Sequence, residues 1–361
     1  MTEAPAPHGP RPHERLGSLP GLKPAHRWMA GSLAFLLVAG CSSYRPPGRA
    51  LGRAGDEIVV AGQLFHTGSR VVLWMDPGGY DAYRTERRFV PLAESSWEKS
   101  KPGLPASASP NRFGLRQDHL TPEQLEQVRG GGWPLPLLQN VVDQFVLHFD
   151  ASGTSQRCFE TLHDKRCLSV HFMIDLDGTI YQTLDLKERA WHATSSNSRS
   201  VGVEIASPGA FPVGKAEALD KWYGKDSHGA TQITLPKDGK DPGFKVPGFI
   251  PRPARPAPVE GTLQGQALRQ YDFTPEQYAA LAHLTATLCS VFPRLKCDYP
   301  RGADGRPVME KLPEATLKQY QGLIGHYHIQ ADKVDPGPAF DWDRVVRRAR
   351  QLRGSPPEPK P

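Results

Sequence analysis

The stretch Val141-Val142-Asp143-Gln144-Phe145-Val146-Leu147-His148 is the segment from which the fold is predicted most directly. Its β-branched and aromatic residues are typical of a strand, and this strand ends in a histidine. Two more strands are expected at 168–174 and 179–183, on either side of the hairpin turn signal Asp175-Leu176-Asp177-Gly178. A further strand is expected at 200–205, because residues 201, 203 and 205 are apolar.

Helical segments alternate with these strands. The run Thr274-Pro275-Glu276-Gln277 opens a helix whose following apolar residues fall near helical spacing. Shorter helices are expected at 121–126, 314–320 and 340–352. Strands that alternate with helices favour an α/β domain with a mixed central β-sheet flanked by helices.

Two Gly- and Pro-rich stretches interrupt the pattern, at 207–262 and 298–313, and both are expected to be long loop insertions, the first a candidate lid. Near the N-terminus, residues 58–60 and 71–74 are expected to pair as a hairpin around His66-Thr67-Gly68. The predicted organisation is therefore a signal segment at 1–41, a tether and N-terminal extension with a β-hairpin at 42–135, the main domain at 136–350 and a disordered tail at 351–361.

Composition limits the class of partner. The chain has 361 residues, of which 38% are apolar, enough for one large core or two smaller ones. Its net charge of +6 fits a polyanionic partner such as a cell wall or a membrane surface. There is no stripe of Lys and Arg interleaved with aromatic residues and no nucleic-acid motif, so nucleic acid is not an expected partner.

The N-terminal segment predicts export. Its apolar run at 29–40 is too short to span the ~30 Å hydrocarbon core of a bilayer, and basic residues precede it, as in a signal peptide. Val38-Ala39-Gly40-Cys41 resembles a bacterial lipobox, in which Cys41 becomes the lipidated first residue. Ser42, in place of Asp, then favours the outer membrane, facing the periplasm. The alternative is an ordinary secretory signal with an incidental cysteine.

Export would place the other four cysteines in an oxidising compartment. Proximity in the sequence pairs Cys158 with Cys167 and Cys289 with Cys297, although four cysteines allow three connectivities. A structural zinc cluster is disfavoured, because no pair has the two-residue spacing of a CxxC motif.

The segment from Gly325 to Pro338 combines His326, Lys333 and Asp335 with Pro336-Gly337-Pro338. Two prolines and a glycine predict a rigid loop, which can hold an imidazole and a carboxylate at a fixed separation for a metal ion. A lysine beside a metal cation is unfavourable unless it faces negative charge that forms during a reaction. The segment therefore indicates a hydrolytic metal site. His328, two residues from His326, is expected to point elsewhere.

His148 and Glu204, on two of the predicted strands, complete the chemistry such a site needs. A catalytic zinc takes three protein ligands and one open position, and it can lower the pKa of a bound water toward ~7. A nearby carboxylate can take the proton from this water and hand it to the leaving amine. Glu204 in an apolar strand is costly to bury without such a purpose.

Five blocks, in this order, resemble the type-2 N-acetylmuramoyl-L-alanine amidases, zinc enzymes that share their fold with peptidoglycan recognition proteins. The blocks are Phe145-Val146-Leu147-His148, Val170-His171-Phe172-Met173-Ile174-Asp175-Leu176-Asp177-Gly178-Thr179-Ile180-Tyr181-Gln182, Arg189-Ala190-Trp191-His192-Ala193, Asn197-Ser198-Arg199-Ser200-Val201-Gly202-Val203-Glu204-Ile205 and the loop that begins at Gly325-His326. The resemblance covers roughly 141–347, without the two insertions.

The resemblance implies roles for individual residues. His148, His326 and Asp335 would be Zn²⁺ ligands, Glu204 the general base and acid, and Lys333 the oxyanion donor. Four further residues are candidates for substrate binding, and for each a structural role stays open: His171, Trp191, His192 and Asn197.

Three departures qualify the resemblance. Val170 stands where phage-type relatives have a tyrosine, which agrees with the branch that uses the glutamate; this branch includes the muropeptide-recycling amidase and an outer-membrane lipoprotein amidase. The spacing from His326 to Lys333 is one residue shorter than expected for that branch. The two insertions are also additional.

The function expected from these observations is zinc-dependent hydrolysis of the amide between N-acetylmuramic acid and L-alanine, with peptidoglycan or muropeptides as partners and an N-terminal lipid anchor in the membrane. One alternative is a recognition module that binds peptidoglycan without cutting it, but such relatives usually lack a zinc ligand. The other is a zinc hydrolase of a different amide.

Overall fold

The computed structural model describes residues 47–354, except 105, 107 and 236–241. The predicted signal segment with Cys41 and most of the predicted tail lie outside the described residues, although α7 includes residues 351 and 352. Among the helices that are described, the model holds none with the length and apolar character needed to cross a membrane.

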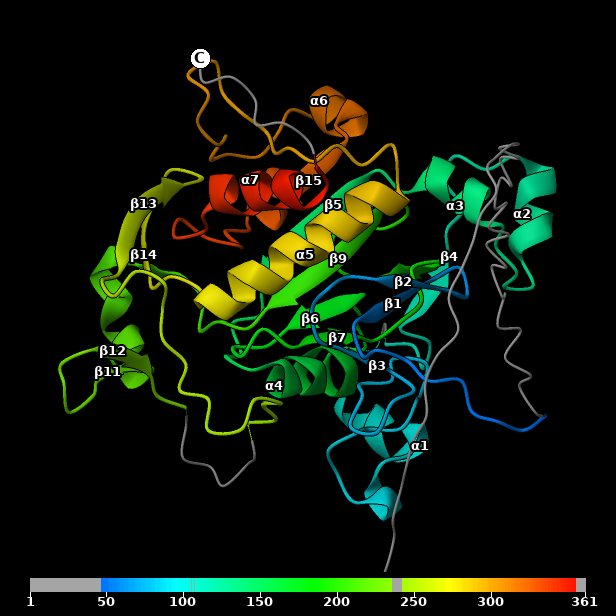
Figure 1. Cartoon of the computed structure of the whole chain (residues 1–361), viewed down its shortest axis with the longest axis horizontal. Helices are drawn as coiled ribbons and strands as arrows, with labels where there is room; N and C mark the ends of the chain where they lie inside the picture. Colours follow the sequence, from blue (N-terminus) through cyan, green and yellow to red (C-terminus); the bar gives the residue numbers. More distant parts are fainter. Residues whose placement is uncertain (1–46, 105, 107, 236–241, 355–361) are drawn as a thin grey trace, which may run out of the picture. The chain divides into compact units, whose positions relative to one another are not determined.

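A six-stranded mixed sheet forms the centre of the fold (Figure 1). The strands are, in spatial order, β15 (Gly322–Gly325), β5 (Gln144–Phe149), β9 (Ser200–Ile205), β6 (Phe172–Ile174), β7 (Ile180–Gln182) and β3 (Val71–Leu73). All neighbours are parallel except β6 and β7, which form the antiparallel hairpin predicted around Asp175–Gly178. The predicted fold class is therefore confirmed.

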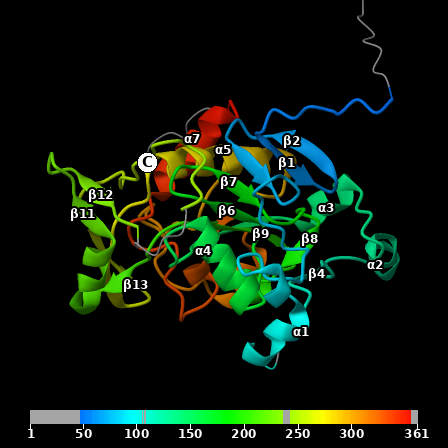
Figure 2. The same ribbon diagram turned by 90° about the horizontal axis from the view of Figure 1, so that it is seen from below.

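Helices cover both faces of this sheet. α5 (Pro275–Val291) and α7 (Trp342–Leu352) pack against each other on one face, and α4 (Ser155–Phe159) lies on the other (Figure 2). β9 is buried along its whole length, and β5 is buried up to His148, as expected for parallel strands covered on both faces. α5 begins where the sequence predicts, because Thr274 and Gln277 form a capping box and Pro275 occupies the first turn.

The N-terminal hairpin differs from its prediction. β1 (Glu57–Val60) pairs with β2 (Gln63–His66) around Ala61-Gly62, and β3 instead joins β7 in the central sheet. Ala61 and Gly62 have φ values of 50° and 74°, which suit a tight two-residue turn. Residues from β1 onward are tied to the sheet, since the Gln182 amide bonds the N–H and the C=O of Val59.

The first insertion is also not a bare loop. It carries β10 (Phe211–Pro212), η5 (Val213–Lys221), β11 (Tyr223–Lys225) and β12 (Thr231–Ile233), and it ends within a hairpin made of β13 (Val259–Leu263) and β14 (Gln266–Gln270). β14 lies between β10 and β13 in a separate three-stranded sheet. The expected boundary at 262 cut through this hairpin, whose turn residues Gln264 and Gly265 both have positive φ. The second insertion, 298–313, has one isolated bridge, between Arg301 and Pro307.

Short elements complete the described chain. They are η1 (Leu92–Glu94), α1 (Trp97–Ser100), η2 (Lys101–Gly103), β4 (Phe113–Leu115), α2 (Pro122–Val128), α3 (Leu135–Val141), η3 (Glu160–Lys165), β8 (Glu188–Ala190), η4 (Thr194–Ser196), α6 (Glu314–Gln319) and η6 (His326–His328). The helices expected near 121–126, 314–320 and 340–352 are thus present as α2, α6 and α7.

The four predicted disulfide cysteines are free, buried thiols in the structure. Cys158 is close to Glu204, Asp150 and Asp175, whereas Cys167 is close to Arg112 and Asp164, so the two face different surroundings. Cys289 and Cys297 do interact, and the hydrogen bond with Cys297 followed by burial raises the pKa of the Cys289 thiol.

Candidate active site

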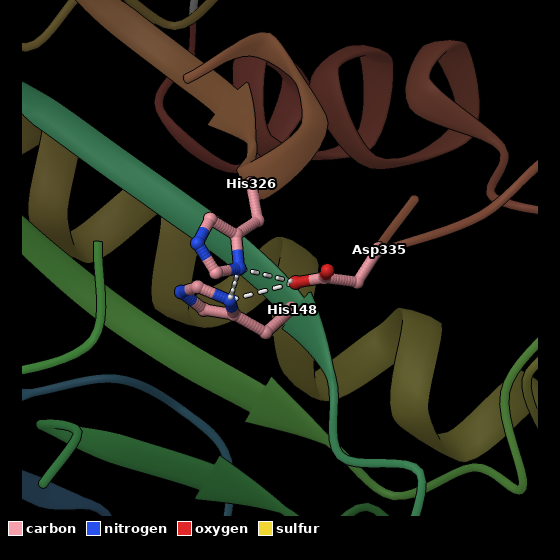
Figure 3. A group of neighbouring side chains, drawn as sticks. All are labelled: His148, His326 and Asp335. Atoms are coloured by element: carbon pink, nitrogen blue, oxygen red, sulfur yellow. Dashed lines mark hydrogen bonds and ion pairs between the residues drawn. The ribbon is translucent and has the colours of Figure 1, made fainter. Parts of the chain in front are cut away.

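Three neighbouring parallel strands bring the candidate catalytic residues to one edge of the sheet. His148 lies near the end of β5, in register with Glu204 on the adjacent β9. His326 follows the last residue of β15, which pairs with β5 on its other side. Since the carboxyl ends of parallel strands meet at one edge, the three side chains are close although the sequence separates them widely. The loop after His326 returns to this edge with Asp335 (Figure 3).

The side chains of His148, His326 and Asp335 converge on one point. Asp335 Oδ2 lies 2.8 Å from His148 Nδ1 and 3.0 Å from His326 Nδ1, and the two Nδ1 atoms are 3.1 Å apart. All three residues are buried. Three lone-pair-bearing atoms at this spacing repel one another unless a proton or a cation lies between them, and two imidazoles with one carboxylate are a zinc donor set. The residues present therefore fit a zinc ion.

Hydrogen bonds on the far sides of both imidazoles fix their orientation. His326 Nε2 lies 2.7 Å from Gln330 Oε1, which can only accept, so Nε2 carries the proton and Nδ1 is left with its lone pair. His148 Nε2 lies 3.0 Å from His192 Nδ1. Such partners are usual for metal-binding histidines, whose tautomer they set. Sequence reasoning missed Gln330, and its only signal was its position four residues after His326.

The charges of the three residues also suit a metal. Burial, followed by the nearby His326, lowers the pKa of His148, which favours its neutral form. Burial alone would raise the pKa of Asp335, but its side-chain interactions with His148 and His326 hold this pKa well below its usual range. Neutral imidazole and ionised carboxylate are the forms that bind metals.

Glu204 faces the same cavity, which has a volume of about 250 Å³. Its side chain is buried, and its Oε2 has no hydrogen-bond partner among the residues that the structure describes. Burial, and then the charge of Asp335, raises the pKa of Glu204 well above its usual value. Lys333 lines the cavity as well, with its side chain 35% exposed and its Nζ 3.6 Å from Asp332 Oδ2.

The four candidate substrate-binding residues separate into two pairs. Trp191 and His192 line the cavity, and Trp191 Nε1 is buried without a partner within the described part of the chain. Asn197 and His171 lie behind them. Asn197 Oδ1 accepts hydrogen bonds from the backbone N–H groups of His192 and Ala193, at 3.1 and 2.7 Å. It thereby shapes residues 191–199, between β8 and β9, which we call the Trp191 loop.

His171 is fully buried, and burial lowers its pKa to about 3. Its Nδ1 accepts from the backbone N–H of Gly202, and its Nε2 lies 2.9 Å from the Glu188 carbonyl oxygen. His328 also points away from the metal group, as expected, because its ring bonds Gly325 N–H and the Val308 carbonyl.

Two ionisable residues near the site were not singled out from the sequence. Asp150 lines the cavity, and burial raises its pKa to about 7, although its Oδ1 accepts three backbone hydrogen bonds. Arg116, in the N-terminal extension, donates to backbone carbonyls on both sides of the Trp191 loop, including those of Leu186 and Ser200. No local pattern in the sequence marks either residue.

Comparison with known proteins adds to this geometry. The protein family described as N-acetylmuramoyl-L-alanine amidase matches residues 138–338, more than half of the chain. The chain is 25% identical over 216 residues to the 1,6-anhydro-N-acetylmuramyl-L-alanine amidase AmpD of Salmonella typhimurium. The aligned region covers 60% of this chain and 70% of that protein.

Two solved structures are similar at low identity. One is a selenomethionine derivative of AmpD, 19% identical, with 68% of this chain and 96% of that chain covered and a TM-score of 0.30. The other is AmiD from E. coli in complex with anhydro-N-acetylmuramic acid-L-Ala-D-gamma-Glu-L-Lys, 16% identical, with 66% and 65% covered and a TM-score of 0.31.

Proposed function

We propose, from the premise that this chain belongs to the N-acetylmuramoyl-L-alanine amidase family, that its reaction depends on a zinc ion held by His148, His326 and Asp335. The chain is an amidase of the bond between N-acetylmuramic acid and L-alanine. The observation that carries the zinc proposal is the convergence of two oriented Nδ1 atoms and one carboxylate oxygen at the wall of the cavity. A bound zinc ion would polarise the amide carbonyl and acidify a water molecule.

Glu204 is the residue that moves the proton. Because its Oε2 is buried and unpartnered in the described structure, it is free to accept a proton from the attacking water. The raised pKa of Glu204 then lets it keep this proton long enough to pass it to the leaving nitrogen, which is a poor leaving group without one. Lys333, on the cavity wall, supplies positive charge to the oxygen that becomes negative as the carbonyl is attacked.

Peptidoglycan fragments are the substrates that this site would take. Trp191 offers an unpartnered indole N–H and an apolar ring face at the cavity, which suits a sugar or a peptide backbone. The Salmonella relative is named for a 1,6-anhydro sugar, so released anhydro muropeptides should be assayed beside intact wall.

The proposed location is the outer membrane, with the protein held there by a lipid on Cys41 and facing the periplasm. Support comes from the sequence, in which Val38-Ala39-Gly40-Cys41 stands at the end of an apolar segment. Fractionation of cells that express the full chain or its Cys41→Ser variant tests this. The full chain should sediment with membranes and the variant should not. Equal distribution of the two would contradict the anchor.

Mass spectrometry of purified muropeptides tests the reaction. The protein is incubated with them after loading with zinc, and again with a metal chelator. Free stem peptide that begins at L-alanine, and that disappears on chelation, is the expected result. Intact muropeptide despite bound zinc would point to a different amide, and intact muropeptide with no zinc bound would point to a recognition module.

A further inference from the structure

The β13–β14 hairpin lies against the loop that carries two of the three candidate zinc ligands. We call residues 326–335, from His326 to Asp335, the metal loop. The hairpin turns at Gln264 and Gly265, whose φ values are 50° and 72°. A glutamine in the left-handed region is unfavourable, and such a residue persists where its side chain or backbone is needed.

The Gln264 amide holds the first half of the metal loop. Its Nε2 donates to the carbonyl oxygens of Tyr327 and Gln330, at 2.7 and 3.3 Å, and its Oε1 accepts from the backbone N–H of Lys311 at 3.1 Å. Tyr327 directly follows His326, and Gln330 is the residue whose side chain accepts from His326 Nε2. Gln264 therefore fixes both the backbone next to the ligand and the residue that orients its ring.

The Gln270 amide holds the other end. This side chain is fully buried, its Nε2 donates to the Pro336 carbonyl at 3.0 Å, and its Oε1 accepts from Ala339 N–H at 3.0 Å. Pro336 directly follows Asp335. Gly337 between these contacts has φ +92°, and a Cβ there would sit 2.0 Å from Gln270 Oε1, so the loop and the amide fit only with glycine at 337.

We propose that the β13–β14 hairpin is a clamp that positions the metal loop, with Gln264 and Gln270 as its positioning residues. The Tyr327 carbonyl, in the single turn η6, and the Pro336 carbonyl accept their side-chain hydrogen bonds from Gln264 and Gln270. The Gln330 carbonyl accepts from Gln264 as well as from the backbone N–H of Lys333, at 3.2 Å. The residues next to both ligands of the loop are thereby held from one hairpin. The clamp's benefit to zinc binding rests on the proposed function.

Gln264→Gly separates positioning from stability. Glycine is the residue best suited to positive φ, so relief of backbone strain at position 264 offsets stability that is lost with the three hydrogen bonds of the amide, and the variant should still fold. Gln264→Glu is a second variant, which keeps an acceptor for Lys311 N–H but removes both donors. Gln266→Ala is the matched control, because Gln266 is exposed on the same hairpin.

Two measurements decide the proposal. The first is the zinc dissociation constant by competition with a chromophoric chelator, and the second is hydrogen exchange of the metal-loop amides in zinc-free protein. We expect Gln264→Gly and Gln264→Glu to bind zinc roughly 10–100-fold more weakly than wild type, the usual effect of removing a partner outside the ligand shell. Their amides from Tyr327 to Lys333 should exchange faster, and the melting temperature of Gln264→Gly should stay close to that of the wild type.

Zinc affinity and amide exchange of Gln264→Gly equal to those of Gln266→Ala would overturn the clamp. A wild-type protein that binds no zinc would instead overturn the proposed zinc dependence, and hydrogen exchange of the metal loop would then decide the clamp by itself.

Discussion

Among the residues that the structure describes, two groups of side chains combine histidine with carboxylates at a spacing that one metal ion could bridge. They are His148, His326 and Asp335 at the edge of the central sheet, and Asp56, Glu57 and His66 at the N-terminal hairpin. Their compositions are similar, but their surroundings are not. The first group is buried at a cavity, whereas the His66 side chain is 75% exposed.

Hydrogen bonding separates the two groups more sharply than exposure does. The Glu57 carboxylate accepts from the backbone N–H groups of Ala54 and Gly55, and Asp56 accepts from Gly68 N–H and pairs with His66. These oxygens stabilise a turn. In the sheet-edge group, by contrast, the lone pairs of His148 and His326 face one another, and the far nitrogens of both rings are held by other side chains. Residue type alone does not make a metal site; convergence of unused lone pairs does.

The largest expected difference between the groups is in zinc binding. His326→Ala removes one of three donors, so the protein should lose stoichiometric zinc and essentially all amidase activity. His66→Ala should retain both. Metal content by mass spectrometry and muropeptide cleavage measure the two effects. If His66→Ala lost zinc while His326→Ala kept it, the assignment of the metal site would be reversed.

The next largest effect is a loss of catalysis that leaves metal binding unchanged. Glu204→Gln keeps the shape of the side chain but removes its ability to accept a proton, so kcat should fall roughly 10²–10⁴-fold, the usual contribution of a general base. Zinc content should stay at the wild-type level, because Glu204 is not among the three converging donors. A variant that retained wild-type kcat would show that another group accepts the proton.

The pH dependence of activity should report the same residue. Glu204 must be ionised to act as a base, and burial, the larger cause, with the charge of Asp335 raises its pKa above the ordinary 4.5. Activity should therefore fall as the pH drops through a midpoint above 4.5. Zinc content measured at each pH separates this loss from loss of metal, since protons also compete for the histidines. An acid limb at or below 4.5 with zinc retained would contradict the raised pKa.

The sequence predicted the core of the sheet well and its N-terminal edge badly. The strand ending at His148 and the turn at Asp175–Gly178 were recognisable because a doubly buried strand and a tight turn each have a strong local pattern. The residues of β3 also look like a strand, but nothing local shows that Val71–Leu73 pairs with Ile180–Gln182 rather than with β1. Pairing over such a separation is decided by tertiary packing.

The candidate site likewise contains residues that the sequence could identify and residues that it could not. Resemblance to a family grouped His148, His326, Asp335 and Glu204, and the structure places all four at one cavity. It could not identify Gln330, Gln264 or Gln270, because a glutamine that bonds a histidine ring or a loop carbonyl has the same local pattern as one on a surface. Gln264 and Gln270 reach the metal loop from the β13–β14 hairpin, which lies outside the motifs that carry the resemblance.

The smallest expected effect is the contribution of the exposed group to stability, and it should depend on pH. The hydrogen bond to Asp56, the largest cause, raises the pKa of His66 above 6.5 in the folded state. A group whose pKa is higher in the folded than in the unfolded protein stabilises the fold below the unfolded value, and this stabilisation is lost as the pH rises through the folded value. His66→Ala should therefore lower the melting temperature slightly at pH 5 and leave it unchanged at pH 8.5. Calorimetric scans at the two pH values measure this difference, with a variant at an exposed histidine, His228→Ala, as the control. An equal change in melting temperature at both pH values would mean that His66 contributes packing and not an ion pair.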